Sequence, residues 1–251
     1  MTSAPEGAEP LLVVHPTRAR LSAGIGARLA LAVLDAQAER GWADVSLTGG
    51  TMGSSLVAAL AESPLRELVD WERVGIWWGD ERYLPAGDAD RNDTQNDDAG
   101  LRSLGIPAEH VHRVPGPDTS GSAEEAAQAY EAALREHGRG SFDVMILGVG
   151  PDGHVASLFP GHPAQLSDDA IAVAVHGSPK PPPDRVSLTL ECLARSRQVW
   201  FVVAGDDKAQ AVADGMAGAG PERSSAAQVR GQQATLWLVD QSAAGQVTER
   251  G

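Results

Sequence analysis

Short apolar segments recur along the whole chain and are rich in β-branched and aromatic residues. They are LLVVH at 11–15, ADVSL at 43–47, RVGIWW at 73–78, FDVMIL at 142–147, IAVAVH at 171–176, QVWFVV at 198–203 and ATLWLV at 234–239. Strands with one face in water alternate polar and apolar residues, whereas strands covered on both faces are apolar throughout. The pattern therefore predicts a mostly parallel sheet between layers of helices.

Helical patterns fill the gaps between these strands. Leu21, Ile25, Leu29 and Val33 recur every four residues, and Gly41 follows where a helix C-cap belongs. The stretch AEEAAQAYEAALREHG at 123–138 is acidic at its start and basic near its end, as the helix dipole favours. Helices also fit 52–62 and 206–217. The predicted fold class is α/β: a three-layer, mostly parallel Rossmann-like sheet with helices on both faces, with a small additional sheet as an option.

The domain organisation follows from the absence of internal repeats and long linkers in the sequence. We expect a single α/β domain over residues 1–251, a length that one domain of this class accommodates. PKPPP at 179–183 predicts a stiff, extended connector, and residues 243–251 predict a flexible tail.

The net charge and the single cysteine limit the classes of binding partner and the cellular location that we expect. The chain has 20 Lys and Arg against 34 Asp and Glu, a formal net charge of −14, which opposes binding to nucleic acid and to anionic membranes. No apolar run approaches the roughly 20 residues of a membrane span, and MTSAPEGAEP does not resemble a signal peptide. Cys192, the one cysteine, forms no internal disulfide. We expect a cytoplasmic monomer or small homo-oligomer that binds neither nucleic acid nor membranes.

Glycine and polar residues follow four of the predicted strands. These segments are Thr48–Thr51, Gly79–Arg82, Gly148–His154 and Ala204–Lys208. Ligands of open parallel sheets bind beyond the carboxyl ends of the strands, so we expect the four segments to face one edge. The first, Thr48-Gly49-Gly50-Thr51, suits a phosphate, because glycine lets backbone N–H groups approach an anion at a helix N-terminus. The alternative is a tight turn with Thr51 as the N-cap.

Charged residues in two of these segments add to a possible anion site. Arg82 would clamp a phosphate, and Asp80 would hold Arg82 or a sugar hydroxyl. The alternative is a solvated loop, since the stretch from Asp80 to Asp98 carries a local charge of −5. Lys208 and Arg185 are either ordinary surface cations or further phosphate ligands.

The third segment contains the best candidate for a catalytic base. Gly148–Gly153 matches G-x-G-x-x-G, but Pro151 and Pro160 argue against a dinucleotide site. His154 is suited to proton transfer near neutral pH, and Asp152 would fix its tautomer. Backbone N–H groups of this loop, including that of Gly150, are candidate oxyanion donors. His110 and His112 have no third ligand after them, so no metal site is expected.

These segments together resemble one family. FDVMILGVGPDGHVASLFPGH at 142–162 contains the DGHxASLFPG signature of the 6-phosphogluconolactonases, which belong to the sugar-phosphate isomerase and deaminase superfamily. WWGDERYLP at 77–85, SLTGGTMG at 46–53, PPPDRVSLTLECL at 181–193 and VVAGDDKAQAV at 202–212 resemble further family segments. Thr48 and Gly53 stand where the family usually has Ser and Pro, and only Asn92 of its SNY segment is present.

The resemblance implies hydrolysis of 6-phosphogluconolactone to 6-phosphogluconate, the second step of the oxidative pentose phosphate pathway, without metal or organic cofactor. It implies that His154 is the base, oriented by Asp152. It also implies that the phosphate of this small phosphosugar lactone lies on the glycine loop near Arg82, Arg185 and Lys208. The alternatives are a glucosamine-6-phosphate deaminase and a non-catalytic sugar-phosphate sensor. Val155–Pro160 favours the lactonase over the deaminases, which have an IAFNEP-like stretch there.

Overall fold

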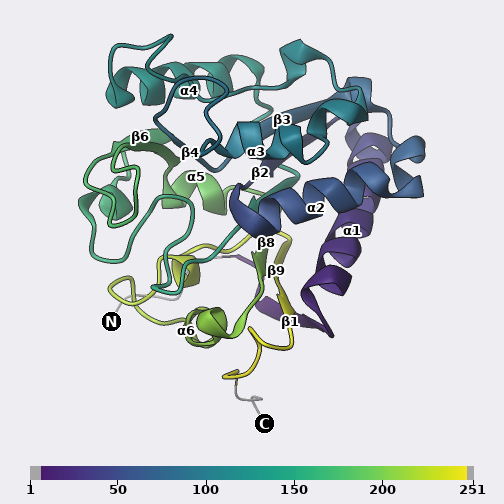
Figure 1. Ribbon diagram of the computed structural model, residues 1–251, viewed down its shortest axis with the longest axis vertical. Coiled ribbons are helices and arrows are strands. Elements are labelled where there is room, and N and C mark those ends of the chain that lie inside the picture. The colour runs from purple at the N-terminus through teal and green to yellow at the C-terminus, as the bar shows by residue number, and fades with distance from the viewer. Residues whose placement is uncertain (1–6, 248–251) are drawn as a thin grey trace.

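A six-stranded parallel sheet forms the centre of the molecule (Figure 1). The computed structural model describes residues 7–247. The strand order is β1 (Pro10–His15), β9 (Ala234–Asp240), β8 (Gln198–Val203), β5 (Val144–Leu147), β2 (Ala43–Leu47) and β3 (Val74–Trp78). Each neighbouring pair in this sheet is parallel. The mostly parallel sheet predicted from the apolar segments is therefore confirmed.

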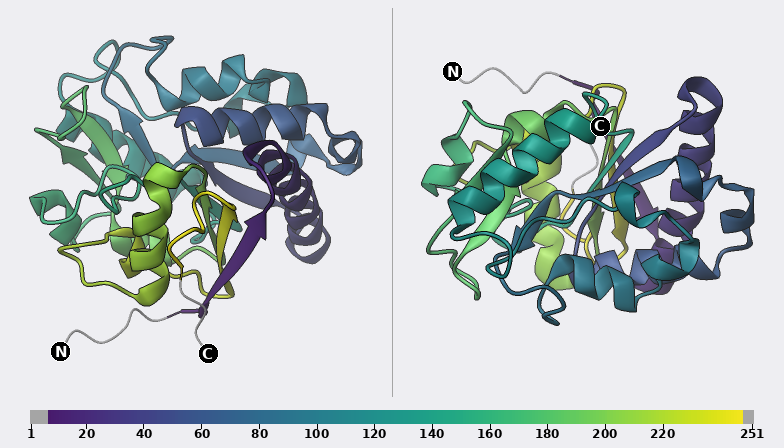
Figure 2. Two further views of the ribbon diagram at one scale, coloured as in Figure 1. Left: turned by 60° about the horizontal axis from the view of Figure 1, so that its bottom comes forward. Right: turned by 90° about the horizontal axis from the view of Figure 1, so that it is seen from above.

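Helices cover both faces of this sheet, as the two views in Figure 2 show. One side carries α1 (Arg18–Arg40), α2 (Gly50–Glu62) and α3 (Asn92–Asp98). The other side carries α4 (Ala123–His137), α5 (Leu190–Ala194) and α6 (Ala209–Ala217). The predicted α/β class with helices on both faces is confirmed.

Each face of the sheet has its own apolar core because successive side chains of a strand point to opposite faces. In β5, Val144 and Ile146 pack with the residues of α1 and α2, whereas Met145 and Leu147 pack on the other side. All four side chains are buried. This double burial explains why the strands are apolar along their whole length.

Helix α1 has the length of a membrane span but the packing of a core helix. Its 23 residues are long and apolar enough to cross a bilayer by length and composition alone. Our expectation that the chain contains no segment of this kind is therefore corrected. The helix contains Arg28 and Asp35 and buries Leu21 and Ile25 in the core. Gly41 ends it in the left-handed conformation with φ of 73°, as predicted for the C-cap.

A second, antiparallel sheet of three strands lies beside the main one. Its order is β4 (Asp80–Arg82), β7 (Arg185–Leu188) and β6 (Ala172–Val175). The apolar segment at 171–176 thus belongs to this sheet and not to the parallel one. A four-residue apolar strand reads the same in either kind of sheet, so its pattern did not distinguish them.

Two predicted chain segments differ from expectation. The connector at 179–183 bends around the guanidinium group of Arg185, which donates hydrogen bonds to the carbonyls of Lys180, Pro181 and Pro182. The predicted tail begins too early, because Ala243 is fully buried and its N–H donates to Asp240 Oδ1. Residues 1–6 of the predicted non-signal start and residues 248–251 of the tail lie outside the described part of the chain.

Candidate active site

The candidate site lies at the carboxyl edge of the parallel sheet, where the four polar segments follow β2, β3, β5 and β8. The chain proceeds from β2 outward to β3 on one side and from β5 outward to β8 and β9 on the other. Such a reversal between adjacent strands opens a crevice at their carboxyl ends, where open α/β sheets bind ligands. The position matches the expectation from the sequence.

His154 and Asp152 form a pair in the loop after β5. The Nδ1 atom of His154 lies 2.5 Å from Oδ1 of Asp152. The imidazole packs on the ring of Phe159 at a centroid distance of 4.5 Å and is mostly shielded from solvent. The carboxylate is more open, with 41% of the Asp152 side chain exposed.

The contact with Asp152 determines the tautomer of His154. Burial opposes ionisation of Asp152, but the hydrogen bond from His154 and the charge of Lys180 outweigh it and hold the pKa of Asp152 well below its usual range. An ionised carboxylate only accepts hydrogen bonds, so Nδ1 carries the proton. The lone pair of neutral His154 is then on Nε2, which is the atom available to take a proton from water.

Lys180 completes this group, although nothing in its proline-rich surroundings indicated a role in the site. Its Nζ atom lies 3.7 Å from Oδ1 of Asp152 and 3.4 Å from Nδ1 of His154. Because Nδ1 already carries a proton, the ammonium group acts on the carboxylate and not as a donor to the imidazole. Lys180 therefore balances the charge of Asp152.

Gly150 leaves the space in which this pair fits. A Cβ atom at position 150 would lie 2.0 Å from Nδ1 of His154 and 2.3 Å from Oδ1 of Asp152. The N–H of Gly150 donates to the carbonyl of His154 at 3.0 Å, and the N–H of Gly153 donates to Gly150. Both N–H groups are hydrogen-bonded within the loop in this structure, so a role of the Gly150 N–H as an oxyanion donor would require it to leave the His154 carbonyl.

Arg82 and Asp80 come from β4 and meet through Asn92, the first residue of α3. Arg82 Nη1 donates to Oδ1 of Asn92, whose Nδ2 donates to the carbonyl of Asp80 at 2.7 Å. Ser157 Oγ donates to Oδ2 of the buried Asp80 at 2.6 Å. Asp80 thus holds Arg82 indirectly. Among the described residues Arg82 forms no ion pair, and its Nε is buried without a partner.

The glycine loop lies against the same asparagine. A Cβ atom at Gly49 would lie 1.8 Å from Oδ1 of Asn92. Gly49 is the N-cap of α2 and provides no side-chain cap, so the alternative of Thr51 as the N-cap is wrong. The N–H of Gly50 donates to Oε1 of Gln95 at 2.9 Å. The positive end of α2 therefore adjoins Arg82 and Asn92.

The other two predicted cations differ in their availability. Arg185 is buried, and its guanidinium group is occupied by the carbonyls of residues 180–182 and by Ser157 Oγ at 3.4 Å. Burial lowers the pKa of Arg185. Burial lowers the pKa of Lys208. The charge of Lys180 lowers it further, and the charges of Asp207 and Asp152 offset this only in part. Lys208 therefore lies on the side of the catalytic pair, whereas Arg185 supports the loop that carries Lys180.

Comparisons with known proteins identify the family of this chain. Residues 16–237 match the family described as glucosamine-6-phosphate isomerases/6-phosphogluconolactonase. The chain belongs to this family. It is 48% identical over 247 residues to a protein of Streptomyces coelicolor named 6-phosphogluconolactonase, covering 95% of both chains. A Mycobacterium tuberculosis protein of the same name is 42% identical over 241 residues, covering 93% of this chain and 97% of the relative.

The fold of the family is shared as well. The crystal structure of 6-phosphogluconolactonase from Thermotoga maritima superposes with a TM-score of 0.81 at 26% identity, covering 93% of this chain and all of that one. Among residues 7–247, no cluster of three or more His, Cys, Asp or Glu side chains is arranged to hold a metal ion.

Three positions contribute to the site beyond those named from the sequence: Lys180, Ser157 and Glu81. Lys180 lies in a proline-rich run, and Asn92 was known only as a match to the family's SNY segment. Ser157 holds Asp80, and Glu81 accepts hydrogen bonds from the backbone N–H groups of Asn92 and Asp93 at 2.7 and 2.9 Å. Only the resemblance to the family around DGHVAS and GDER could have indicated these residues from the sequence. The chemistry of each residue on its own did not.

Proposed function

We propose that this protein hydrolyses 6-phosphogluconolactone to 6-phosphogluconate, with His154 as the general base. The observation that carries the proposal is the pairing of His154 with Asp152 at the carboxyl edge of the sheet, the edge that also carries Arg82, which forms no ion pair among the described residues. Relatives named 6-phosphogluconolactonase that are 48% and 42% identical over nearly the whole chain support the substrate. A δ-lactone is an activated ester, so one positioned base and one positioned phosphate are sufficient for its hydrolysis.

In the proposed reaction Nε2 of His154 takes a proton from a water molecule as the water oxygen attacks C1 of the lactone. The tetrahedral intermediate then collapses, the bond between C1 and the ring oxygen breaks, and Nε2 returns the proton to that oxygen. The new carboxylic acid releases its proton to solvent. Asp152 stabilises the imidazolium that exists between the two transfers. General acid and base assistance of this kind contributes roughly 10²- to 10⁴-fold in rate.

The phosphate group of the substrate would be held at the other end of the site. Arg82, Asn92 and the N-terminus of α2 would form this subsite, and Lys208, on the side of the catalytic pair, would reach the substrate between its two ends. Arg82 is the strongest candidate for direct contact, because its guanidinium group is not paired with a carboxylate among the described residues. Arg185 takes part by holding residues 180–182. Binding energy at the phosphate would position C1 at His154.

The proposal extends to location and assembly. A cytoplasmic location is consistent with the free thiol of Cys192. We further propose that one α/β unit carries the whole site and that it works as a monomer or small homo-oligomer. Its substrate is the phosphosugar lactone alone, with no nucleic-acid or membrane partner.

The test is lactone hydrolysis above the spontaneous rate, followed by coupled oxidation of the 6-phosphogluconate formed. His154→Gln keeps the size and polarity of the side chain and is expected to lower kcat by roughly 10²- to 10⁴-fold. His137→Gln is the matched control, because His137 is an exposed histidine on α4. Wild-type turnover in the His154 variant would overturn the mechanism. Release of ammonia from glucosamine 6-phosphate would instead indicate a deaminase.

A further inference from the structure

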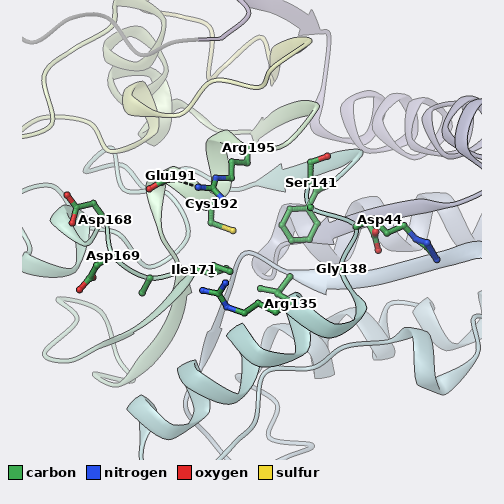
Figure 3. Close-up of a pocket in the computed structure, with 15 residues that line it drawn as sticks. Asp44, Arg135, Gly138, Ser141, Asp168, Asp169, Ile171, Glu191, Cys192 and Arg195 are labelled. Atoms are coloured by element: carbon green, nitrogen blue, oxygen red, sulfur yellow. Dashed lines mark hydrogen bonds and ion pairs between the residues drawn. The ribbon is translucent and has the colours of Figure 1, made fainter.

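A second cavity lies at the amino edge of the parallel sheet, opposite the candidate active site. Its volume is about 410 Å³, within the range of small-molecule sites. It is bounded by the second residue of β2, the end of α4, the loop before β6 and the start of α5 (Figure 3). The mechanism proposed above uses none of the residues that line it.

Asp44 gives this cavity an unsatisfied acceptor. The residue is 2% exposed, and its Oδ1 accepts a hydrogen bond from Trp77 Nε1 at 3.0 Å. Its Oδ2 is buried and accepts no hydrogen bond of good geometry, although the indole of Trp42, whose Nε1 is also buried without a partner, lies near enough to lower the pKa of Asp44. Glycine at position 75 of the neighbouring strand leaves room for this carboxylate, because a Cβ there would lie 2.2 Å from Oδ1. A buried carboxylate oxygen without a donor is costly, and a ligand with an N–H group would satisfy it.

The guanidinium groups around the cavity are already engaged. Arg135 donates to Glu131 at 2.6 Å, and Arg195 donates to Glu191. The guanidinium of Arg139 lies 4.2 Å from the centroid of the Trp42 ring. Burial raises the pKa of Asp44, and the hydrogen bonds from Trp77 and Trp42 and the charge of Arg139 offset this only in part. An anionic ligand would therefore have to displace existing partners.

The opposite end of the cavity is also acidic. Asp168 and Asp169 are exposed and form no ion pair or hydrogen bond within residues 7–247. In Figure 3 these two carboxylates lie on one side and Asp44 on the other, with the sulfur of Cys192 between them. The apolar side chains of Leu134, Phe142, Ile171 and Cys192 line the middle. Burial raises the pKa of the Cys192 thiol to about 12, so this middle part is uncharged.

We infer that this cavity binds a small organic diamine with an apolar stem. One ammonium group donates to Oδ2 of Asp44, the alkyl stem lies along the apolar middle, and the second ammonium group lies near Asp168 and Asp169. The formal net charge of −14 favours the approach of such a cation. This inference does not depend on the proposed lactonase function.

Calorimetric titration of the full chain with 1,5-diaminopentane tests the inference. The wild type is expected to bind the diamine saturably and more tightly than 1-aminopentane, because the single amine lacks the second ammonium group. Asp44→Asn is expected to weaken diamine binding by about tenfold or more, since the amide removes the charge and keeps the shape. Asp35→Asn, an exposed substitution on α1, is the matched control and is expected to bind as the wild type does.

Cys192→Phe provides a second variant that fills the middle of the cavity and is expected to abolish binding. Thermal unfolding checks that each variant is folded, and lactone hydrolysis is expected to stay within about twofold of wild type because the site lies at the other edge of the sheet. Absence of saturable binding to the wild type at millimolar diamine would overturn the inference. So would equal affinity for the monoamine, unchanged affinity in a folded Asp44→Asn variant, or binding of inorganic phosphate in place of the diamine.

Discussion

Replacing Asp152 by asparagine tests the central contact of the proposed mechanism. The amide oxygen is still able to accept a hydrogen bond from Nδ1 of His154, which lies 2.5 Å from the present carboxylate oxygen. The tautomer of His154 is then largely kept, but the negative charge opposite the imidazolium is lost. We therefore expect a lower kcat with little change in KM, because Asp152 does not contact the phosphate subsite.

The size of the effect follows from the exposure of the pair. A hydrogen bond to a charged group contributes about 1.5–3 kcal/mol. Asp152 is 41% exposed and is shared with Lys180 at 3.7 Å, so water and the ammonium group screen it and the lower half of this range applies. About 1.5–2 kcal/mol corresponds to a loss of roughly 10- to 30-fold in kcat.

The assay is lactone hydrolysis at saturating substrate over a range of pH. An imidazolium that has lost its carboxylate partner is less stable, so the acidic limb of the kcat profile is expected to move to lower pH. A merely structural effect would not shift this limb. Asp35→Asn, an exposed change on α1, is the control for loss of a surface carboxylate. Wild-type kcat in Asp152→Asn, or an equal loss in the control, would refute the reasoning.

Three further substitutions test other parts of the structure. Arg82→Ala is expected to raise KM by roughly 10- to 100-fold with little effect on kcat, measured by steady-state kinetics, because it removes a charged contact to the phosphate. Gly215→Ala places a Cβ 2.1 Å from Trp237 and is expected to destabilise the fold by about 1–3 kcal/mol, seen as a lower Tm. His112 is stacked on Trp77, and burial lowers its pKa from 6.5 to about 4. As the pH falls from 6.5 to 4, His112 is therefore protonated in the unfolded chain before it is protonated in the folded one, and the free energy of unfolding decreases. His112→Phe should reduce that loss by roughly 1–2 kcal/mol in denaturant titrations at pH 7 and pH 4, and an unchanged loss would contradict the explanation.

The layered fold was predictable because a strand that is buried on both faces is apolar along its whole length, and such segments are easily recognised in the sequence. ADVSL and QVWFVV form strands with the bounds expected from their apolar pattern, and Gly41 ends α1 as expected. Local patterns do not record which strands become neighbours. For this reason the short strand β6 was placed in the wrong sheet, and the polar strand β4 was not recognised at all.

The candidate site was predictable where function depends on a short contiguous motif. Asp152 and His154 are two residues apart, so their contact follows from one loop. The role of Arg185 depends instead on hydrogen bonds to the carbonyl groups of residues 180–182. The position of Lys180 in turn depends on how this segment bends around the guanidinium group of Arg185. These contacts form only when β7 pairs with β4 in the antiparallel sheet, which no local pattern predicts.

The acidity of the chain is compatible with an anionic substrate because the acids nearest the site are used to build it. Glu81 accepts hydrogen bonds from the first N–H groups of α3, and Asp93 pairs with the buried Arg91 at 2.9 Å. Arg82, in the same stretch, forms no ion pair within the described chain. At physiological ionic strength charges beyond about 8 Å are screened, so the exposed acids elsewhere contribute little to the field at the site. In the proposed function a substrate phosphate would therefore meet the unpaired guanidinium group of Arg82 on a protein whose net charge is −14.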